Sequence, residues 1–600
     1  MEFQMNQYRK AERESGEPLP FYEQELIRAM EVKYGPLPVI VSASLVYLSL
    51  FVRAGHVYLP LDRTLTEWGE LLDLEERYFP NLENADPDVL DNHPITGSSD
   101  GDAPLVFVKN HLSFRIHHQQ EKRLAKQLNR IAQSKGAFPA EEVRESLEKM
   151  FPDGDEPINW QRVAAAEALA NRLLILSGGP GTGKTTTVAK IIQLMQKVGG
   201  QRLSVAVTAP TGKAAARLND SLLNQISGDL PESDGRLWSG TLHRLLFGRG
   251  DRKMLPPVWT EPLIYDLVVV DEASMVDLSM MYRLMEHLGE ETRLILLGDH
   301  HQLSSVEAGA VLSEICRNKR NLFLPETAEA LQQQTGYSAL PTGEQSDLEN
   351  CTVYLEKGYR FDSLSGIGQL AESLRNGNSE ETAEIVSGEW PDLSTVNFSY
   401  GEDAIAELSR QFVARYKEAE LLSPEEMLDF WSREIWLTLP KRGVFGSVSL
   451  NRFVEDWLER EEGIRRLNGW YHGRPVMITR NDYTLEVYNG DFGVCIEKEP
   501  GYFELLLQQP GHSVRTLPVE RLGDTEPACF LTVHKSQGSE FDRVHLLLPK
   551  DPSRFMTREL IYTAITRARS HCFLYGDPQR VVEASENPTE RFSSLSSYLF

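Results

Sequence analysis

Cysteine is scarce in this sequence. Its 600 residues include five cysteines, none of them close to another along the chain: Cys316, Cys351, Cys495, Cys529 and Cys572. The wide spacing excludes the paired C-x-x-C motifs of zinc and iron–sulfur sites. The odd number and the spacing fit a reducing compartment, so we predict a cytoplasmic protein.

Long hydrophobic runs are also scarce, and the first residues do not predict a signal peptide. The first twenty residues carry charges of both signs and have no apolar core, unlike a signal peptide. The only membrane-like stretch, residues 37–52, is shorter than the ~20 residues that a bilayer span needs, contains serines and is followed by Arg53. We therefore predict a buried helix in this stretch and no membrane association.

Basic residues are outnumbered by acidic ones. The chain has 62 Lys and Arg against 88 Asp and Glu, which gives a formal net charge of −26. Non-specific attraction to nucleic acid is therefore not a property of the whole molecule, and any binding of a phosphate backbone must be local. The length predicts several domains, and a composition of 41% hydrophobic and 25% charged residues excludes collagenous and wholly disordered classes.

The pattern along the chain predicts an α/β protein with three parts. Residues 1–145 show helical segments around an acidic, loop-prone interval at 83–102, which predicts a mostly helical N-terminal domain. From Leu173 short apolar runs alternate with helix-length segments, as in a parallel sheet, and we assign 146–350 to a first lobe and 351–600 to a second. Short strand-like runs predict a small β-barrel or sheet inserted at about 469–528.

The strongest chemical signal is a phosphate-binding loop. The pattern G-x-x-x-x-G-K-[ST] follows the apolar run LLIL and precedes a helix-like segment, so that backbone N–H groups can surround a phosphate chain. Lys184 would reach the β- and γ-phosphates and the Thr185 hydroxyl would bind Mg²⁺. The alternative is a glycine-rich turn without function. The predicted nucleotide contacts in the loop are Gly178, Gly179, Pro180, Gly181, Thr182, Gly183, Lys184, Thr185 and Thr186.

Two further strand-like runs end in polar residues. Asp271 and Glu272 follow LVVV, where Asp271 would hold Mg²⁺ and Glu272 would orient or deprotonate the attacking water. The alternative is that the two carboxylates cap a helix start. The run RLILLGD is followed by Gln302, whose amide could sense a γ-phosphate, although a Gly-Asp turn after a strand is common.

The order of these motifs resembles that of superfamily 1 helicases. The series covers about 410 of the 600 residues: Gln161, GGPGTGKTT (178–186), TAPTGKAAARL (208–218), SGTLHRLL (239–246), VVVDEASM (268–275), LGDHHQL (297–303), GYRF (358–361), TVHKSQGSEF (532–541) and YTAITRARS (562–570). Three more segments resemble, within that superfamily, the alpha subunits of exodeoxyribonuclease V: GHVYLPL (55–61), SGIGQL (365–370) and RNDYTLEVYNGDFG (480–493).

The resemblance implies two RecA-like lobes that close on ATP and Mg²⁺. It implies an ATP-dependent 5′-to-3′ single-strand DNA translocase and helicase, the motor subunit of a heterotrimeric helicase–nuclease that processes double-strand DNA ends for recombinational repair. The beta and gamma subunits of exodeoxyribonuclease V would be its partners. Gln161 would read the adenine edge, whereas Arg360 and Arg567 would reach the γ-phosphate. The alternative for the same residues is that Gln161 is an exposed helix residue and that Arg360 and Arg567 form ion pairs on the surface.

The resemblance also implies a track for single-stranded DNA across both lobes. The residues predicted to contact the DNA are Thr211, Lys213, His243, Thr532, His534, Lys535 and Ser536. The alternative is that they are ordinary polar residues at loop ends. No nuclease constellation of spaced Asp, Glu and Lys is found, so the chain is interpreted as a motor only. The rival interpretations are an ATP-gated assembly subunit without motor activity, a free-standing 5′-to-3′ helicase, and a small-molecule kinase or hydrolase. The N-terminal region lacks the glycine-rich helix-hairpin-helix extension of free-standing relatives, which favours a docking domain.

Overall fold

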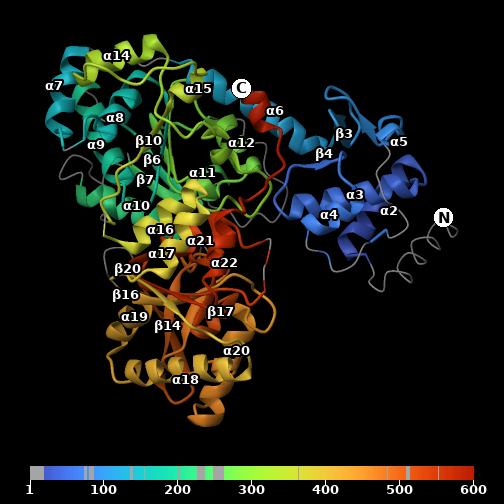
Figure 1. Ribbon diagram of the computed structural model, residues 1–600, viewed down its shortest axis with the longest axis vertical. Coiled ribbons are helices and arrows are strands. Elements are labelled where there is room, and N and C mark those ends of the chain that lie inside the picture. Colours follow the sequence, from blue (N-terminus) through green and yellow to red (C-terminus); the bar gives the residue numbers. More distant parts are fainter. Residues whose placement is uncertain are drawn as a thin grey trace.

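The computed structural model describes most of the chain, and Figure 1 shows its arrangement. The described residues are 19–72, 74, 78–79, 87–134, 140–154, 156–199, 203–225, 237–247, 262–361, 364–482, 484–508, 514–551, 553 and 555–600. Most of the N-terminal segment considered as a leader and residues 83–86 of the acidic interval lie outside these ranges. Among the helices described, none has both the length and the apolar character that a membrane crossing requires.

The N-terminal part contains helices and a small sheet. The predicted buried helix is confirmed as α3 (Val39–Arg53), in which Val41 to Leu48 are fully enclosed. The expectation of a mostly helical region is incomplete, because a four-stranded sheet in the order β1-β4-β3-β2 accompanies the helices. Its strands are two to four residues long, too short to show an alternating pattern. The elements are α2 (Phe21–Tyr34), α3, β1 (Tyr58–Pro60), α4 (Leu65–Leu71), α5 (Pro87–Asp91), β2 (Thr96–Gly97), β3 (Leu105–Val108) and β4 (His111–Phe114).

The first lobe is a six-stranded, wholly parallel sheet in the order β10-β5-β9-β8-β6-β7. The predicted end of this lobe at residue 350 is too early, because β10 (Thr352–Leu355) pairs with β5 in this sheet. The loop-rich stretch before β10 resembles a linker in composition, but the chain returns after it to the same sheet. The other strands are β5 (Leu173–Gly178), β6 (Val205–Ala209), β7 (Leu237–Thr241), β8 (Leu267–Val270) and β9 (Arg293–Gly298).

Helices cover both faces of this sheet. Successive residues of β5 point to opposite faces, so Leu173 and Ile175 join one core whereas Leu174 and Leu176 join the other. The helices of the first lobe are α6 (Arg115–Ala132), α7 (Ala140–Met150), α8 (Trp160–Ala170), α9 (Lys184–Gly199), α10 (Gly212–Gln225), α11 (Leu242–Phe247), α12 (Leu278–His287), α13 (Val311–Ile315), α14 (Pro325–Thr335) and α15 (Asp347–Asn350).

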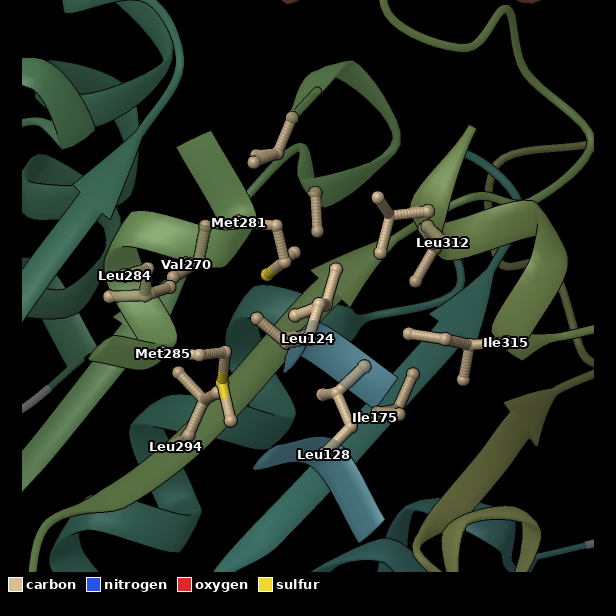
Figure 2. Close-up of a cluster of buried hydrophobic side chains, with 14 of the residues drawn as sticks. Leu124, Leu128, Ile175, Val270, Met281, Leu284, Met285, Leu294, Leu312 and Ile315 are labelled. Atoms are coloured by element: carbon tan, nitrogen blue, oxygen red, sulfur yellow. The ribbon is translucent and has the colours of Figure 1, made fainter. Parts of the chain in front are cut away.

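Helix α6 belongs to the core of the first lobe. Figure 2 shows Leu124 and Leu128 of α6 beside Ile175 of β5, with α12 and α13 around them. Helix α7 likewise contributes Val143 and Leu147 to the core on the other face. The predicted domain limit at residue 145 therefore cuts through this packing, and the core changes near residue 115 instead. The membership of α6 and α7 in the first lobe was not predictable, because a helical pattern does not indicate against which neighbour the helix will pack.

The second lobe has a five-stranded parallel sheet in the order β11-β20-β19-β12-β18. The α/β class with parallel sheets in both lobes is thus confirmed. The strands are β11 (Leu393–Val396), β12 (Glu434–Thr438), β18 (Phe530–Thr532), β19 (Phe541–Leu547) and β20 (Ala568–Tyr575). The helices are α16 (Gly366–Asn376), α17 (Ser379–Ser387), α18 (Glu402–Ala419), α19 (Pro424–Arg433), α20 (Ser447–Glu461), α21 (Arg558–Ile565) and α22 (Gln579–Ser585), whereas α23 (Leu595–Leu599) packs into the core of the first lobe.

An antiparallel sheet lies between β12 and β18 along the chain, where strand-like runs predict an insertion. Its order is β16-β15-β14-β13-β17, with its own apolar cluster between the strands. Asn489 and Gly490 form a turn before β14, and Gly490 has a φ of 94° that favours glycine. The strands are β13 (Pro475–Ile478), β14 (Phe492–Glu499), β15 (Tyr502–Gln508), β16 (Val514–Pro518) and β17 (Thr525–Pro527).

The C-terminal segment returns from the second lobe to the N-terminal part and to the first lobe. The backbone N–H of Val57 donates to the carbonyl of Phe592 at 2.6 Å. Leu595 and Leu599 enter the core beside α6. Glu121 of α6 accepts hydrogen bonds from the Ser593 hydroxyl at 2.6 Å and from the Ser594 N–H at 2.9 Å. The segment therefore connects the second lobe to both the N-terminal part and the first lobe.

Glu121 makes this junction sensitive to pH. Burial raises the pKa of its carboxyl to about 8, with hydrogen bonds from Ser593, Ser594 and Leu595 opposing and the charge of Glu314 adding to the rise. A raised carboxyl pKa means that the folded protein binds the proton more tightly, so stability falls as the pH rises from about 4.5 to 8. We expect Glu121→Gln to raise the melting temperature more at pH 8 than at pH 5. The free energy of unfolding should rise by up to about 5 kcal/mol at pH 8.

Differential scanning calorimetry at both pH values measures this effect. Glu384→Gln is the matched control, since Glu384 is exposed on α17. Equal shifts for the two variants at both pH values would contradict the assignment of a buried charge to Glu121.

Candidate nucleotide site and DNA interface

The phosphate-binding loop joins the end of β5 to the start of α9. Gly181 and Gly183 have φ values of 76° and 82°, in the left-handed region that favours glycine. A Cβ on Gly181 would lie 2.5 Å from Cβ of Arg360, and one on Gly183 would lie 2.6 Å from Nε2 of Gln161. The two glycines thus let two predicted site residues, Arg360 and Gln161, approach the loop backbone.

Lys184 lies over this loop. Its Nζ donates to the carbonyl oxygens of Gly178 at 2.5 Å and Gly179 at 3.0 Å. Thr185 and Thr186 follow in the first turn of α9, where both are partly exposed. An ammonium group, free backbone N–H groups and a hydroxyl at a helix start together suit a polyphosphate.

Asp271 and Glu272 follow β8. The Glu272 N–H donates to Oδ1 of Asp271 at 2.8 Å, and Glu272 has a φ of 51°, a strained value for a residue other than glycine. The helix-cap alternative fails, because the short helix Ala273–Met275 has Glu272 as its N-cap with no side-chain capping bond. Burial and the charge of Glu272 raise the pKa of Asp271, whereas Lys184 opposes the rise.

These acidic groups fit a hard cation. Two adjacent, partly buried carboxylates gain from a positive charge nearby, and the Thr185 hydroxyl offers a further oxygen ligand. Within the described ranges no group of three or more His, Cys, Asp or Glu residues is arranged for a metal. A site with few protein ligands suits Mg²⁺, which keeps several waters and binds phosphates.

Gln302 and Arg567 meet between the lobes. Nη2 of Arg567 donates to Oε1 of Gln302 at 2.9 Å, and both side chains are buried. Gln302 in turn donates through Nε2 to Asp299 at 3.2 Å. Two residues 265 positions apart are therefore in direct contact.

Arg360, the other arginine predicted to reach the γ-phosphate, lies against the phosphate-binding loop. The N–H of its neighbour Tyr359 donates to the carbonyl of Gly181 at 2.9 Å. Its guanidinium pairs with Glu540 at 2.5 Å. Burial favours the protonated form of Glu540, but Arg360, Arg217 and Arg569 hold its pKa at about 2. Sequence reasoning missed Glu540, although it lies inside TVHKSQGSEF.

A shallow pocket lies beside the loop. Gln161 reaches it and donates through Nε2 to the carbonyl of Thr182 at 3.0 Å. The exposed ring of Tyr359 and the side chain of Trp160, neither of them predicted, offer flat surfaces for a base. The lining residues are Glu156, Asn159, Trp160, Gln161, Thr182, Leu355, Glu356, Lys357 and Tyr359.

Thr211 and Lys213 lie where the first lobe meets the second lobe and its insertion. Arg217 of the same helix donates to the carbonyl of Gly538 at 2.7 Å, and a Cβ on Gly212 would meet the Tyr488 ring at 2.4 Å. Burial, with Arg217 adding, lowers the pKa of Lys213 to about 7, whereas Asp491 opposes. The segment 211–217 and the segment 532–538 are therefore side by side.

The other predicted DNA contacts differ in access. His534 and His243 are exposed, whereas Lys535 forms an ion pair with Glu526. Ser536 is buried and its hydroxyl donates to the carbonyl of Val533 at 2.7 Å, so its contact with DNA stays a prediction. Thr532 is also buried, at the end of β18. A loop-end motif does not indicate which of its hydroxyls bonds within its own turn.

Comparison with known proteins adds the family. A family model described as AAA domain matches residues 161–308, and one described as UvrD-like helicase C-terminal domain matches 527–575. The RecBCD enzyme subunit RecD of Haemophilus influenzae is 32% identical over 530 residues, covering 83% of this chain and 81% of that protein. The chain belongs to the RecD family. The RecD subunit of Mycolicibacterium smegmatis is 35% identical over 466 residues, 76% of each chain. The predicted superfamily 1 helicase, an ATP-dependent DNA helicase, is thus confirmed.

A longer relative matches this RecD-family chain over only part of its own length. The ATP-dependent RecD2 DNA helicase of Deinococcus radiodurans is 30% identical over 426 residues, which is 70% of this chain but 49% of that protein. The RecD subunits match over most of their length, whereas this relative contains much that the present chain does not align with.

Proposed function

We propose that this chain is the 5′-to-3′ motor subunit of a heterotrimeric RecBCD-type helicase–nuclease. It would hydrolyse ATP with Mg²⁺ to move along single-stranded DNA from a double-strand end, with the beta and gamma subunits of exodeoxyribonuclease V as partners in the cytoplasm. The observation that carries the proposal is the contact of Arg567 with Gln302, because it joins a second-lobe arginine to a first-lobe amide beside the nucleotide loop. Such a contact can transmit lobe closure to hydrolysis.

The chemistry follows from the groups around the loop. Lys184 and the loop N–H groups bind the phosphates, whereas Asp271 and Thr185 would hold Mg²⁺, which neutralises developing charge on the phosphates when bound. Glu272 orients the attacking water and accepts its proton. Arg360 and Arg567 stabilise the charge on the transferred phosphoryl group from the second lobe. Gln161 holds the base in the pocket beside Thr182.

The proposed strand path runs over the junction between segments 211–217 and 532–538. Thr211, Lys213 and His534 are the proposed contacts there, with His243 farther along the first lobe. Lys535 can contribute a charge only after it leaves Glu526. A local track of this kind is compatible with the net charge of −26, because attraction to a phosphate backbone depends on the charges close to it rather than on the sum over the whole chain.

The proposal is tested by the ATPase activity of the purified chain with and without single-stranded DNA. We expect strong stimulation, and faster displacement of streptavidin from a 3′-biotinylated than from a 5′-biotinylated oligonucleotide. An ATPase indifferent to DNA would favour the alternative of an ATP-gated assembly subunit. Stimulation with the reverse polarity would overturn the direction.

The exposed residues of α2 are the proposed docking surface for the partner subunits. Phe21, Tyr22 and Val32 are 78%, 62% and 84% exposed, which is unusual for apolar side chains so close together on one helix. We expect Phe21→Ser, Tyr22→Ser and Val32→Ser in combination to reduce co-purification of the beta and gamma subunits by about tenfold or more, while DNA-stimulated ATPase of the isolated chain stays unchanged.

Point variants are preferred to deletion of residues 1–145, because that deletion would remove Leu124 and Leu128 from the first core. Leu421→Ser is the matched control, since Leu421 is 87% exposed in the second lobe. A stable three-subunit complex formed by the triple variant would move the proposed interface to another surface.

A further inference from the structure

Tyr562 joins the two lobes beside the nucleotide loop. It lies on α21 of the second lobe, and its hydroxyl donates a hydrogen bond of 2.8 Å to Oδ2 of Asp299, directly after β9 of the first lobe. Tyr562 is 2% exposed and Asp299 is 1% exposed. A hydrogen bond to a buried carboxylate is among the stronger ones in proteins, because water does not compete for it.

The same carboxylate oxygen holds Gln302. Oδ2 of Asp299 accepts from Nε2 of Gln302 at 3.2 Å, and Oε1 of Gln302 accepts from Arg567 at 2.9 Å. Tyr562 and Arg567 are five positions apart in the second lobe, so the four side chains form a hydrogen-bonded chain with two members from each lobe. The bond to Asp299 fixes the amide nitrogen of Gln302, and this turns the amide oxygen toward Arg567.

The hydroxyl of Tyr562 also lies next to the phosphate-binding loop. A Cβ built on Gly179 would lie 3.1 Å from Oη of Tyr562, so the hydroxyl lies against the loop backbone. The backbone around Gln302 is held from the second lobe as well, because the Leu303 N–H donates to the Thr563 hydroxyl at 2.9 Å. Burial, with the charge of Asp299 adding, raises the pKa of Tyr562 well above its usual value, so the phenol keeps its proton at neutral pH.

We propose that Tyr562 is a positioning residue of the ATPase cycle, whose hydroxyl holds Asp299 and thereby Gln302 in register with Arg567 when the lobes are together. The inference rests on the proposed motor function. Tyr562 lies against the loop backbone at Gly179, and it reaches Gln302 through its hydrogen bond to Asp299. Its loss should therefore lower turnover and leave the binding of ATP nearly intact.

Tyr562→Phe tests this by removing a single hydroxyl. We expect kcat of the DNA-stimulated ATPase of the full chain to fall about tenfold or more, with KM for ATP changed less than about twofold. Tyr416→Phe is the matched control. Tyr416 is also buried, and its hydroxyl donates to the carbonyl of His472 at 2.7 Å and to Glu420 at 3.2 Å, all within the second lobe. This variant should keep the parental kcat.

A double-mutant cycle with Asp299→Asn tests the route. If Tyr562 acts through Asp299, the double variant should lose no more kcat than Asp299→Asn alone, whereas multiplicative losses would overturn the proposal. Parental kcat in Tyr562→Phe would overturn it too, and if that variant does not fold, parental kcat in Asp299→Asn would do so. A wild-type ATPase without DNA stimulation would instead contradict the motor function itself.

Discussion

Lys184→Gln is expected to reduce DNA-stimulated ATP hydrolysis to background while the protein stays folded. The ammonium group lies over the loop, where it donates to the carbonyls of Gly178 and Gly179. Glutamine can still donate to a carbonyl, so the loop keeps a partner. It carries no positive charge, however, and cannot neutralise the β- and γ-phosphates in the ground state or the transition state.

A phosphate-release assay with excess DNA measures the loss, and circular dichroism checks the fold. Lys190→Gln is the matched control on the same helix, because Lys190 donates to the carbonyl of Met150 at 2.7 Å and lies over the Phe151 ring. It should retain hydrolysis. Hydrolysis by Lys184→Gln near the parental rate would show that another lysine or arginine binds the phosphates.

Local signals predicted the elements that sequence periodicity controls. The apolar run at 37–52 became α3, and the runs before the glycine-rich loop and the acidic pair became β5 and β8. Pairing across long distances was not predictable. β10 joins β5 across 170 residues and more, and α6 covers the first sheet, because both choices depend on surfaces that form only in the folded chain. The two-residue strand β2 is too short for any pattern.

The candidate site divides in the same way. The motifs placed Asp271 and Glu272 at the end of β8 and Lys184 at the start of α9, after the loop that follows β5, and the carboxyl edge of the parallel sheet brings these segments together. The hydroxyl of Ser536 bonds within its own turn, which the motif did not indicate. Glu540 and Tyr562 were missed because each acts on a partner far away in sequence, Arg360 and Asp299 respectively. A motif indicates that a segment is important without indicating which of its side chains cross to the other lobe.

Arg567→Ala is expected to slow hydrolysis by roughly three orders of magnitude or more while weakening ATP binding only modestly. The guanidinium is buried and makes three hydrogen bonds, to Gln302 at 2.9 Å and to the carbonyls of Thr563 and Ser539 at 3.1 and 3.3 Å. This rigid fork is already positioned between the lobes, so little entropy is lost when charge develops on the transferred phosphoryl group. The arginine therefore acts mainly on the transition state.

Single-turnover hydrolysis and fluorescent-nucleotide binding separate the two effects. Arg567→Lys keeps the charge but loses the fork, so we expect it to recover ATP binding and little of the turnover. Arg543→Ala is the matched control on the neighbouring strand β19, since Arg543 pairs at 3.5 Å with Glu434, away from Gln302. Equal losses of affinity and turnover in Arg567→Ala would indicate a ground-state phosphate clamp, and parental turnover would exclude Arg567 from the site. Because alanine leaves buried Thr563 and Ser539 carbonyls without their donor, melting temperatures of all three variants must accompany the kinetics.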